Sequence, residues 1–579
     1  MKGRARERGR RRSWQSAALV LVALVLAATD ARAQGNALSA PTGGRSALMG
    51  NTGVALSRDG SAPFLNPATI VRINDNSLAF SVNFYTFQST HFSGWHQPGP
   101  VDTSQFGDVA LGGTSISSNN FRIFPSTLCL FFTIHGVTAE GANDNGLHSG
   151  RQKLAVCFGT TEFQDVVLPS LPFSGNTPAG STTQTQSLAL QWNRFQAGPT
   201  YSISFSDDFA VGASLHGVYT SESFLLDSTS ITSVTSGGAV QSALGAGTSA
   251  HAIDLALILG AAYHRGNVTL GASVQVPSLH VFGQYSATLH SEYGLSGTDN
   301  ATLSSGTGSF VAPTPIRFSL GAGAEWQRLV LEVDGSLQLP VASIESSVNG
   351  STTTLTGTAA TTAPFSAYYT IPQVVAFNAA VGGEYFLSKG FSLLGGASTS
   401  LTTLPALSPT MTVGNLVQSR TSSATLSFGI GSYGGGADLL IGTQLGYIWG
   451  QSIAADPYAL PNDWAVVGTH AYSVTFILAG ATDLRSIGRA VEKVENAVTN
   501  GSPEVTPAGP GHPGEAPPKP CTRELPRSGP TDPRNQNLDT TPPPPNKPPP
   551  APDGGAPPQE PQKTPSSPVD PQNRTFPPR

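Results

Sequence analysis

Hydrophobic and polar residues alternate with a period of two in many stretches of this chain. In residues 126–135, 328–339 and 437–449, an extended backbone would place Leu, Ile, Val, Phe, Tyr or Trp on one face and mainly small or polar residues on the other. A period of two is typical of β-strands that have one apolar face. A single stretch of this kind also fits a soluble β-sandwich, so the number and spacing of the strands must decide the fold class.

The pattern predicts fourteen strands. They are residues 77–87, 121–135, 151–160, 186–205, 209–224, 251–263, 267–286, 311–325, 329–343, 371–387, 390–403, 421–432, 437–450 and 465–479. Short connections (206–208, 264–266, 326–328, 388–389 and 433–436) alternate with long ones (88–120, 161–185, 225–250, 287–310, 344–370, 404–420 and 451–464). Segment 136–150 is the exception, because it is long where a short turn is expected. This alternation is typical of a transmembrane antiparallel β-barrel, whose even strand number returns both termini to the periplasm.

Aromatic residues flank the predicted short turns. They are Phe205, Phe209, Tyr263, Trp326, Tyr385, Phe386, Phe391 and Tyr433. Amphipathic rings at one rim of a barrel form a girdle at the membrane–water interface, whereas a sandwich would scatter them through its core. The aromatic residues therefore favour the barrel.

Composition and charge agree with an exported membrane protein. Charged residues make up only 12% of the chain, about half the share in a typical soluble protein. Residues 34–480 contain 12 Lys and Arg against 23 Asp and Glu, a net charge of −11, which argues against nucleic-acid binding. Two classes remain, a large extracellular β-protein and an outer-membrane barrel of a Gram-negative bacterium, and the strand spacing selects the second.

The first 33 residues predict a secretory signal peptide. An Arg-rich start precedes about a dozen apolar residues and the small-x-small pair Ala31 and Ala33, which places cleavage before Gln34. The apolar run is too short for a helix to cross ~30 Å of hydrocarbon.

Residues 34–76 precede the first strand and predict a plug. A barrel of about fourteen strands leaves a bore unless something fills it. Gly and Pro break this segment too often for a long helix or strand, while Phe64 and Leu65 require a wall to bury against. We expect residues 34–76 to fold inside the barrel formed by residues 77–480.

The segment "ALMGNTGVALSRDGSAPFLNPATI" resembles the N-terminal hatch of the FadL outer-membrane transporters of long-chain fatty acids and aromatic hydrocarbons. The matching positions are Gly50, Gly53, Ala55, Asp59, Ala62, Asn66, Pro67 and Ala68. Later stretches, such as "LGASVQVPSLHVFGQYSA" and "NAAVGGEYFLSKGFSLLGGAS", are also similar to parts of the family. The resemblance covers roughly residues 40–480.

The resemblance implies a mechanism and a set of candidate residues. A hydrophobic ligand would enter from the outer loops, a movement of the hatch would release it, and in the family the exit is proposed to pass sideways at a kinked third strand. The hatch and gating candidates are Gly53, Asp59, Phe64, Leu65, Asn66, Pro67 and Ala68. The third predicted strand contains no Pro, so Gly159 is the candidate kink residue.

The predicted lumen face is small and uncharged. It carries Ser319, Gly321, Gly323, Ala376, Ala380, Gly382, Gly442 and Gly446, with Lys153, Arg194 and Arg317 as its few basic candidates. An uncharged bore suits an apolar ligand, and small residues equally leave room for a plug; both interpretations stay open. The alternatives to transport are a structural or adhesive barrel and a general porin, which would more often carry rings of charge.

Two of the three cysteines fit one hairpin. If 136–150 turns near residue 143, Cys129 lies opposite Cys157 on the lumen face, while Leu128, Leu130 and Val156 face lipid. A cross-strand disulfide and two free thiols both fit this arrangement.

Catalytic motifs are missing from the sequence. The eleven His are scattered, and neither G-x-S-x-G nor H-E-x-x-H occurs. We expect no enzyme activity, no metal and no cofactor.

The C-terminal region differs from the barrel. Residues 481–500 have apolar positions at heptad-like spacing, which predicts a short amphipathic helix. Of residues 501–579, 26 of 79 are Pro, which predicts a disordered periplasmic tail. A spacer to the cell wall, a docking segment for a periplasmic partner and an unselected extension all fit the tail. The other expected partners are a hydrophobic ligand and outer-membrane lipid, and a monomer is expected.

Overall fold

The computed structural model describes residues 40–484, except 74–75, 94–114, 136–146, 148, 178–179, 235–237, 296–297, 341–342, 372, 408–418, 435–436 and 456–463. The predicted signal peptide (1–33) and the Pro-rich tail (501–579) lie outside the described residues, and so do residues 485–500 of the helix predicted over 481–500. The start of that helix prediction is wrong, because residues 481–483 belong to the last strand of the barrel. Within the described residues, no helix combines the length and the hydropathy needed to cross a membrane.

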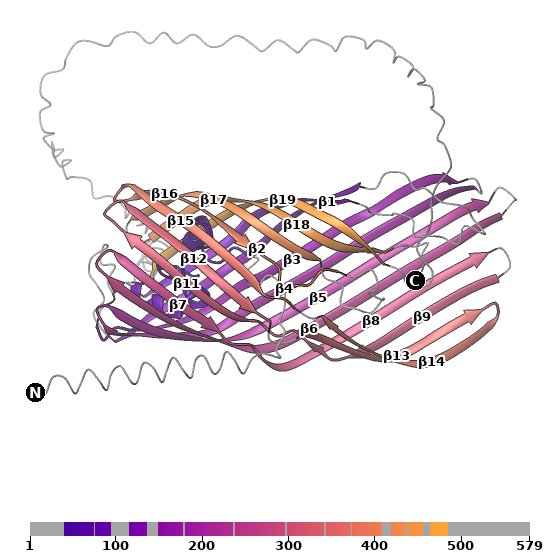
Figure 1. Cartoon of the computed structure of the whole chain (residues 1–579), viewed down its shortest axis with the longest axis horizontal. Helices are drawn as coiled ribbons and strands as arrows, with labels where there is room; N and C mark the ends of the chain where they lie inside the picture. The colour runs from indigo at the N-terminus through magenta and orange to yellow at the C-terminus, as the bar shows by residue number, and fades with distance from the viewer. Residues whose placement is uncertain are drawn as a thin grey trace, which may run out of the picture. The chain divides into compact units, whose positions relative to one another are not determined.

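The β-segments of the described residues form one closed antiparallel sheet (Figure 1). They are β1 (Ser77–Ser93), β2 (Ser115–His135), β3 (Gln152–Thr177), β4 (Gly180–Ser206), β5 (Phe209–Val234), β6 (Gly238–Arg265), β7 (Val268–Gln275), β8 (Leu279–Leu295), β9 (Thr298–Gly308), β10 (Phe310–Val311), β11 (Ile316–Glu325), β12 (Leu329–Leu339), β13 (Ile344–Thr356), β14 (Ala359–Ile371), β15 (Ala376–Ser388), β16 (Phe391–Ser400), β17 (Arg420–Gly434), β18 (Ala437–Ala455) and β19 (Trp464–Asp483).

Several segments are successive pieces of one strand. The pairs β7–β8, β12–β13 and β14–β15 each continue one another, as do β9, β10 and β11, which leaves fourteen strands among the described residues. The last strand, β19, pairs with β1 from Ser77 opposite Asp483 onward, so the sheet closes on itself. The fourteen-stranded antiparallel barrel predicted from the sequence is confirmed.

The alternating pattern sets which face of each strand points inward. In β12, Leu331 and Val333 are 44% and 57% exposed, whereas Glu332 and Asp334 between them are 1% and 7% exposed. The same exposure of apolar residues recurs in β15, β17 and β18. The barrel therefore has an apolar outer surface and a polar interior, the reverse of a soluble β-sandwich.

The strands extend much further than the hydrophobic pattern predicts. Residues 161–185, 225–250, 287–310 and 344–370 were predicted as long outer loops, and this prediction is wrong: almost all of these residues lie in strands. β4, β5 and β6 have 27, 26 and 28 residues, and Figure 1 shows β8, β9, β13 and β14 projecting past the ends of β15 to β18. The projecting parts are rich in Ser and Thr on both faces, so they lack the alternation from which strands were predicted.

Most of the predicted aromatic girdle lies on the outer surface. Phe205, Tyr263, Trp326, Tyr385 and Phe391 are each at least 36% exposed. Phe386 and Tyr433 differ, because they pack against the buried core and contact each other with ring centroids 5.8 Å apart.

The hairpin of β2 and β3 has the register that its apolar pattern predicts. Cys129 lies opposite Cys157, both side chains are buried, and Leu128 and Val156 are exposed. The two sulfur atoms form a disulfide. This bond joins neighbouring strands on the interior face.

We expect peptide mapping of the folded, non-reduced protein to recover Cys129 and Cys157 in one cross-linked pair, because these residues face each other across the hairpin. The same digest after reduction is the control and should release both peptides separately. A link between Cys129 and Cys521 would contradict the register, because Cys521 lies in the tail.

Candidate functional site

The segment before the first strand lies inside the barrel. Residues 40–73 contain two short helices, α2 (Arg45–Leu48) and α3 (Ala62–Leu65), and the 3-10 helix η1 (Pro67–Arg72). Almost every residue of this N-terminal segment is buried. Figure 1 shows it in indigo within one end of the ring of strands. The barrel wall and this segment together form the candidate site.

Small lumen residues make room for the N-terminal segment. A Cβ atom at Gly271 would lie 2.0 Å from the carbonyl oxygen of Val54, and one at Gly382 would lie 2.0 Å from that of Met49. Glycine is required where two backbones approach this closely. Of the two interpretations of the small lumen face, packing of the segment explains these positions.

Two carboxylates of β12 bind the backbone of the segment. Asp334 Oδ2 accepts hydrogen bonds from the N–H groups of Gly53 and Val54, at 2.7 and 3.0 Å. Glu332 Oε1 accepts from Ala55 and Leu56, at 2.7 and 2.9 Å. The strand period places both acids on the interior face, and each satisfies two consecutive buried donors. Charge-assisted bonds of this kind are stronger than neutral ones.

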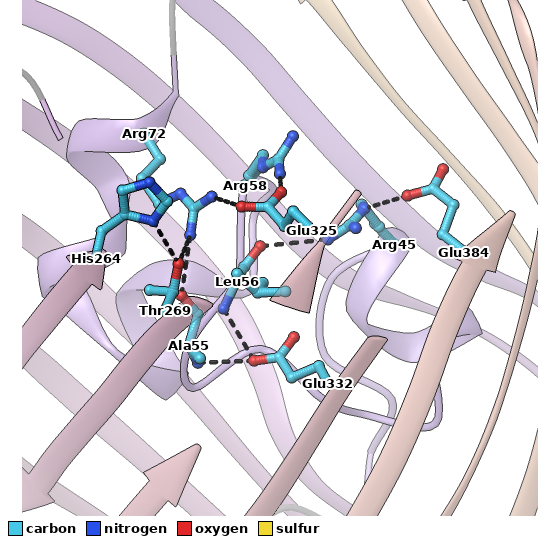
Figure 2. A network of polar contacts seen from close by, with 10 residues as sticks. All are labelled: Arg45, Ala55, Leu56, Arg58, Arg72, His264, Thr269, Glu325, Glu332 and Glu384. Carbon is cyan, nitrogen blue, oxygen red and sulfur yellow. Dashed lines mark hydrogen bonds and ion pairs between the residues drawn. The ribbon is translucent and has the colours of Figure 1, made fainter. Parts of the chain in front are cut away.

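Arginines of the segment pair with further interior acids, as Figure 2 shows. Arg45 Nε donates to Glu384 Oε2 at 2.8 Å. Arg58 and Arg72 both pair with Glu325, and Arg72 also donates to the carbonyl of Ala55 and the hydroxyl of Thr269, at 3.3 and 3.2 Å. The segment thus brings three cations to a cluster of acids on the barrel wall.

Burial and charge act on the pKa values of these arginines in opposite directions. Burial lowers the pKa of Arg72 to about 10, although the negative charge of Glu332 opposes this shift. Burial also lowers the pKa of Arg45, but the combined effect of Glu384, Tyr433 and Glu332 outweighs burial, so the pKa is raised above its ordinary value. Both side chains remain cationic at neutral pH, and the ion pairs persist.

The Asn66–Pro67 turn connects the segment to β6 of the wall. Asn66 Oδ1 accepts from Ala68 N at 3.1 Å and caps η1, which begins at Pro67. Asn66 Nδ2 donates to the carbonyl of Val54 at 2.7 Å and to that of Ala261 in β6 at 3.0 Å. One buried side chain therefore closes its own turn, joins two parts of the segment and binds the barrel.

The other predicted hatch residues take part in the same packing. The carbonyl of Phe64 accepts from Arg317 at 2.9 Å, and that of Leu65 accepts from Ser273 at 2.6 Å. Asp59 instead binds within the segment, where it accepts from the N–H groups of Ser46 and Ser61.

Gly159 gives space to the ring of Phe64. A Cβ atom at Gly159 would lie 2.7 Å from that ring. One of the two register shifts of β3 relative to β4 falls between Thr160 and Glu162, just after Gly159; the other falls between Leu168 and Leu171. The structure therefore places the irregularity of this strand close to the candidate kink residue, with Gly159 itself in contact with the segment.

The backbone hydrogen bonds between β2 and β3 stop part of the way along these two strands. Their backbone ladder runs from His135 to Thr127 opposite Gly159 and ends there. Beyond this point, β2 continues to pair with β1, and β3 with β4. In the described residues, no further backbone ladder joins β2 and β3. We call this stretch of the wall the β2–β3 separation.

Side chains span the β2–β3 separation. Arg122 Nε lies 2.8 Å from Asp165 Oδ2, and the rings of Phe124 and Phe163 stack with centroids 4.5 Å apart. The start of the N-terminal segment also lies here: Ala40 N donates to Thr161 O at 3.3 Å. On the β2 side, the hydroxyl of Ser126 donates to the carbonyl of Pro41.

The prediction of an uncharged lumen is wrong. Buried interior acids include Glu162, Glu222, Asp254, Glu332, Asp334 and Glu384, and buried interior cations include Arg151, Lys153, Arg194 and Arg317. The acids of β12 were visible as alternating polar positions. Their partners were not visible, because the N–H groups that bind these acids lie more than 250 residues away in sequence.

The chain is similar to several solved structures. No protein-family model matches the sequence, and no curated protein matches it. The chain is similar to the structure of a Pseudomonas aeruginosa FadL homologue (13% identity, 77% of this chain and 99% of that chain covered, TM-score 0.43). It is also similar to those of the monoaromatic hydrocarbon channel CymD (14%, 77% and 99%, 0.43) and the Pseudomonas putida toluene transporter TodX (13%, 76% and 98%, 0.45).

We expect the double substitution Glu332→Gln and Asp334→Asn to weaken the attachment of residues 53–56. Hydrogen bonds to charged groups contribute roughly 1.5–3 kcal/mol each, so their replacement by neutral bonds should accelerate amide hydrogen exchange in this turn by about tenfold or more. Hydrogen–deuterium exchange with mass spectrometry measures the effect.

The matched control is Asp227→Asn, which neutralises an exposed acid of β5. Exchange in residues 53–56 should be unchanged in this variant. Unchanged exchange in the double variant would mean that the two carboxylates do not hold the segment.

Proposed function

We propose that this protein is an outer-membrane transporter of hydrophobic compounds in a Gram-negative bacterium, and that its N-terminal segment acts as a hatch. The observation that carries the proposal is the interior of the barrel, which holds a buried segment of the same chain anchored through polar contacts on several sides. A cavity lies beside the start of this segment, at the place where the wall loses its β2–β3 ladder.

The outer surface supports a membrane location. Strands with outward-facing Leu, Val, Ile or Phe, such as β12, β17 and β18, have 11, 15 and 19 residues. They are long enough for the roughly 9–11 positions that a tilted strand needs to cross a bilayer. Aromatic residues such as Phe205 and Trp326 lie beside the short turns, as expected at an interface. We infer that the short turns and both ends of the barrel sequence face the periplasm.

The bonding of the segment supports a gating role. The barrel closes through its own backbone ladder, whereas residues 40–73 form no ladder with it. They attach through side chains, through N–H groups bound to side chains and through the single backbone bond from Ala40 to Thr161 among the described contacts. Release of Glu332, Asp334 and Glu384 from the segment leaves the ladder intact. The segment can therefore change position without opening the barrel.

The β2–β3 separation supports a sideways exit. Residues 40 and 41 hydrogen-bond to β3 and β2, so displacement of the segment removes bonds from both edges. The other described contacts there include the bond from the Thr160 hydroxyl to the carbonyl of Pro125, the pairing of Arg122 with Asp165 and the stacking of Phe124 on Phe163. Each involves a side chain that a rotamer change can withdraw. A hydrophobic ligand leaving here would enter lipid without crossing water.

An adhesive barrel is the second candidate function. The observation in its favour is the long projection of β4, β5 and β6 with its Ser- and Thr-rich faces. An adhesin has no need of a movable interior segment, however. A general porin is disfavoured because the interior is occupied.

We expect deletion of residues 40–72 to leave a barrel that inserts into planar bilayers and conducts ions, because the fourteen-strand ladder does not include this segment. The intact protein should conduct little. The mobility of unheated and heated samples on a gel checks that the deleted protein is assembled. If an assembled deletion variant conducts no better than the intact chain, the segment is not a plug.

We expect cells that produce the intact protein to show saturable uptake of radiolabelled toluene or oleate, and Asn66→Ala with Pro67→Ala to reduce it several-fold. These changes remove the cap of η1 and the bond to Ala261. The control pair is Asn300→Ala with Pro364→Ala, two exposed residues of the projecting strands, which should transport normally. Absence of saturable uptake by the intact protein would support the adhesive alternative.

A further inference from the structure

The cavity beside the hatch has the size of one aromatic ring. It measures about 160 Å³ and lies between β1–β4, β17–β19 and the first residues of the N-terminal segment, Ala40 and Pro41. A protein cavity of roughly 150 Å³ accepts a benzene-sized molecule. The described cavity therefore holds a ring or a short chain, but not a fully enclosed long chain.

The two walls of the cavity differ chemically. One wall carries the apolar, largely aromatic side chains, interspersed with polar and charged residues of β2 and β3. The apolar residues are Phe124, Phe163, Val166, Trp192 and Leu404, and the polar and charged ones are Arg122, Glu162, Gln164 and Asp165. The other wall, from β17 to β19, carries hydroxyl and amide groups on Ser423, Thr425, Gln444, Thr469, Ser473 and Thr475. A ligand that fits both walls has a flat apolar body and at least one hydrogen-bonding group.

Charged groups in the described lining are paired with each other. Arg122 is bound to Asp165, and Glu162 accepts from Arg194 at 2.6 Å and from Trp192 Nε1 at 2.8 Å. A ligand carboxylate would have to separate Arg122 from Asp165 while lying near two acids. Like charges at close range disfavour this arrangement, so the lining favours an uncharged ligand.

One hydroxyl of the polar wall lacks a partner. The side chain of Thr469 is only 6% exposed, and its Oγ1 makes no hydrogen bond with the described residues. Thr475, which lies further along β19 in the same wall, accepts a hydrogen bond from the hydroxyl of Thr86 at 3.1 Å. A buried hydroxyl without a partner is unfavourable, and a ligand hydroxyl or carbonyl in the cavity would satisfy it.

We propose that this cavity binds an uncharged, single-ring compound that carries a hydroxyl or carbonyl group, with its ring against the aromatic wall and its polar group at Thr469. The class is that of phenols and aromatic alcohols. This inference rests on the proposed transport function and names its substrate class more narrowly than hydrophobic compounds in general.

The test compares three probes that share one ring: p-cresol, toluene and benzoate. Equilibrium dialysis of the full-length purified protein at neutral pH gives the affinity for each. We expect p-cresol to bind about tenfold more tightly than toluene, because only p-cresol can bond to the polar wall, and benzoate to bind most weakly, because it is charged.

The substitution Thr469→Val removes the hydroxyl and keeps the shape of the side chain. We expect it to weaken p-cresol binding about 3- to 10-fold, the effect of one hydrogen bond, and to leave toluene binding unchanged. The matched control is Thr443→Val, the same change on the outward face of the same sheet, where Thr443 lies between the exposed Ile441 and Leu445. This control should bind all three probes as the unmodified protein does.

Two results would overturn the inference. One is that toluene or benzoate binds as tightly as p-cresol, and the other is that Thr469→Val leaves the affinity for p-cresol unchanged. The proposed function would survive either result if cells still took up toluene or oleate saturably. Absence of saturable uptake of p-cresol, toluene and oleate would instead reject transport itself. The uptake and binding measurements thus separate failure of the substrate class from failure of the function.

Discussion

The interior of this protein depends on carboxylates of β12 that bind the backbone of the chain's own N-terminal segment. A closed barrel of fourteen strands leaves space that must be filled by side chains, water or another part of the chain. Here a Gly- and Pro-rich segment fills it, and such a segment lacks the regular structure that would satisfy its own N–H groups. Glu332 and Asp334 provide the missing acceptors for four consecutive N–H groups. Because a strand alternates its faces, these acids can point inward while Leu331 and Val333 face outward.

The same constraint explains why the lumen combines glycines with buried charges. Glycines such as Gly271 and Gly382 let the backbone of the segment approach the wall, and acids such as Glu325 and Glu384 then meet the arginines that it carries. Either feature alone would be unfavourable. Lumen glycines without the segment against them would leave a void, and buried acids without a partner would destabilise the fold. Together they specify one position for a segment that has little regular structure of its own.

The sequence predicts the membrane-facing part of the fold well and the rest less well, for physical reasons. Where one face of a strand contacts lipid and the other the lumen, the period of two is strong, and the fourteen strands follow from it. Beyond this band, in residues such as 225–234 of β5, both faces tolerate Ser and Thr, so the period fades although the strand continues. The Asn66–Pro67 turn was visible as a local motif. The pairing of wall acids with arginines and N–H groups of the segment was not visible, because a single sequence does not show which residues meet across more than 250 positions.

The start of the segment connects the ligand cavity to the β2–β3 separation. Ala40 and Pro41 line the cavity, and they also hydrogen-bond to Thr161 of β3 and Ser126 of β2. A ligand can shift a conformational equilibrium only through contacts that differ between the two states. A compound in this cavity would touch Ala40 and Pro41, the residues that bond the segment to both edges of the β2–β3 separation. Displacement of these two residues would therefore change the contacts of the ligand and the contacts of the wall together. The wall acids Glu332, Asp334 and Glu384 bind residues 45 and 53–56 of the segment, away from its start. The first residues can therefore move while the rest stays attached.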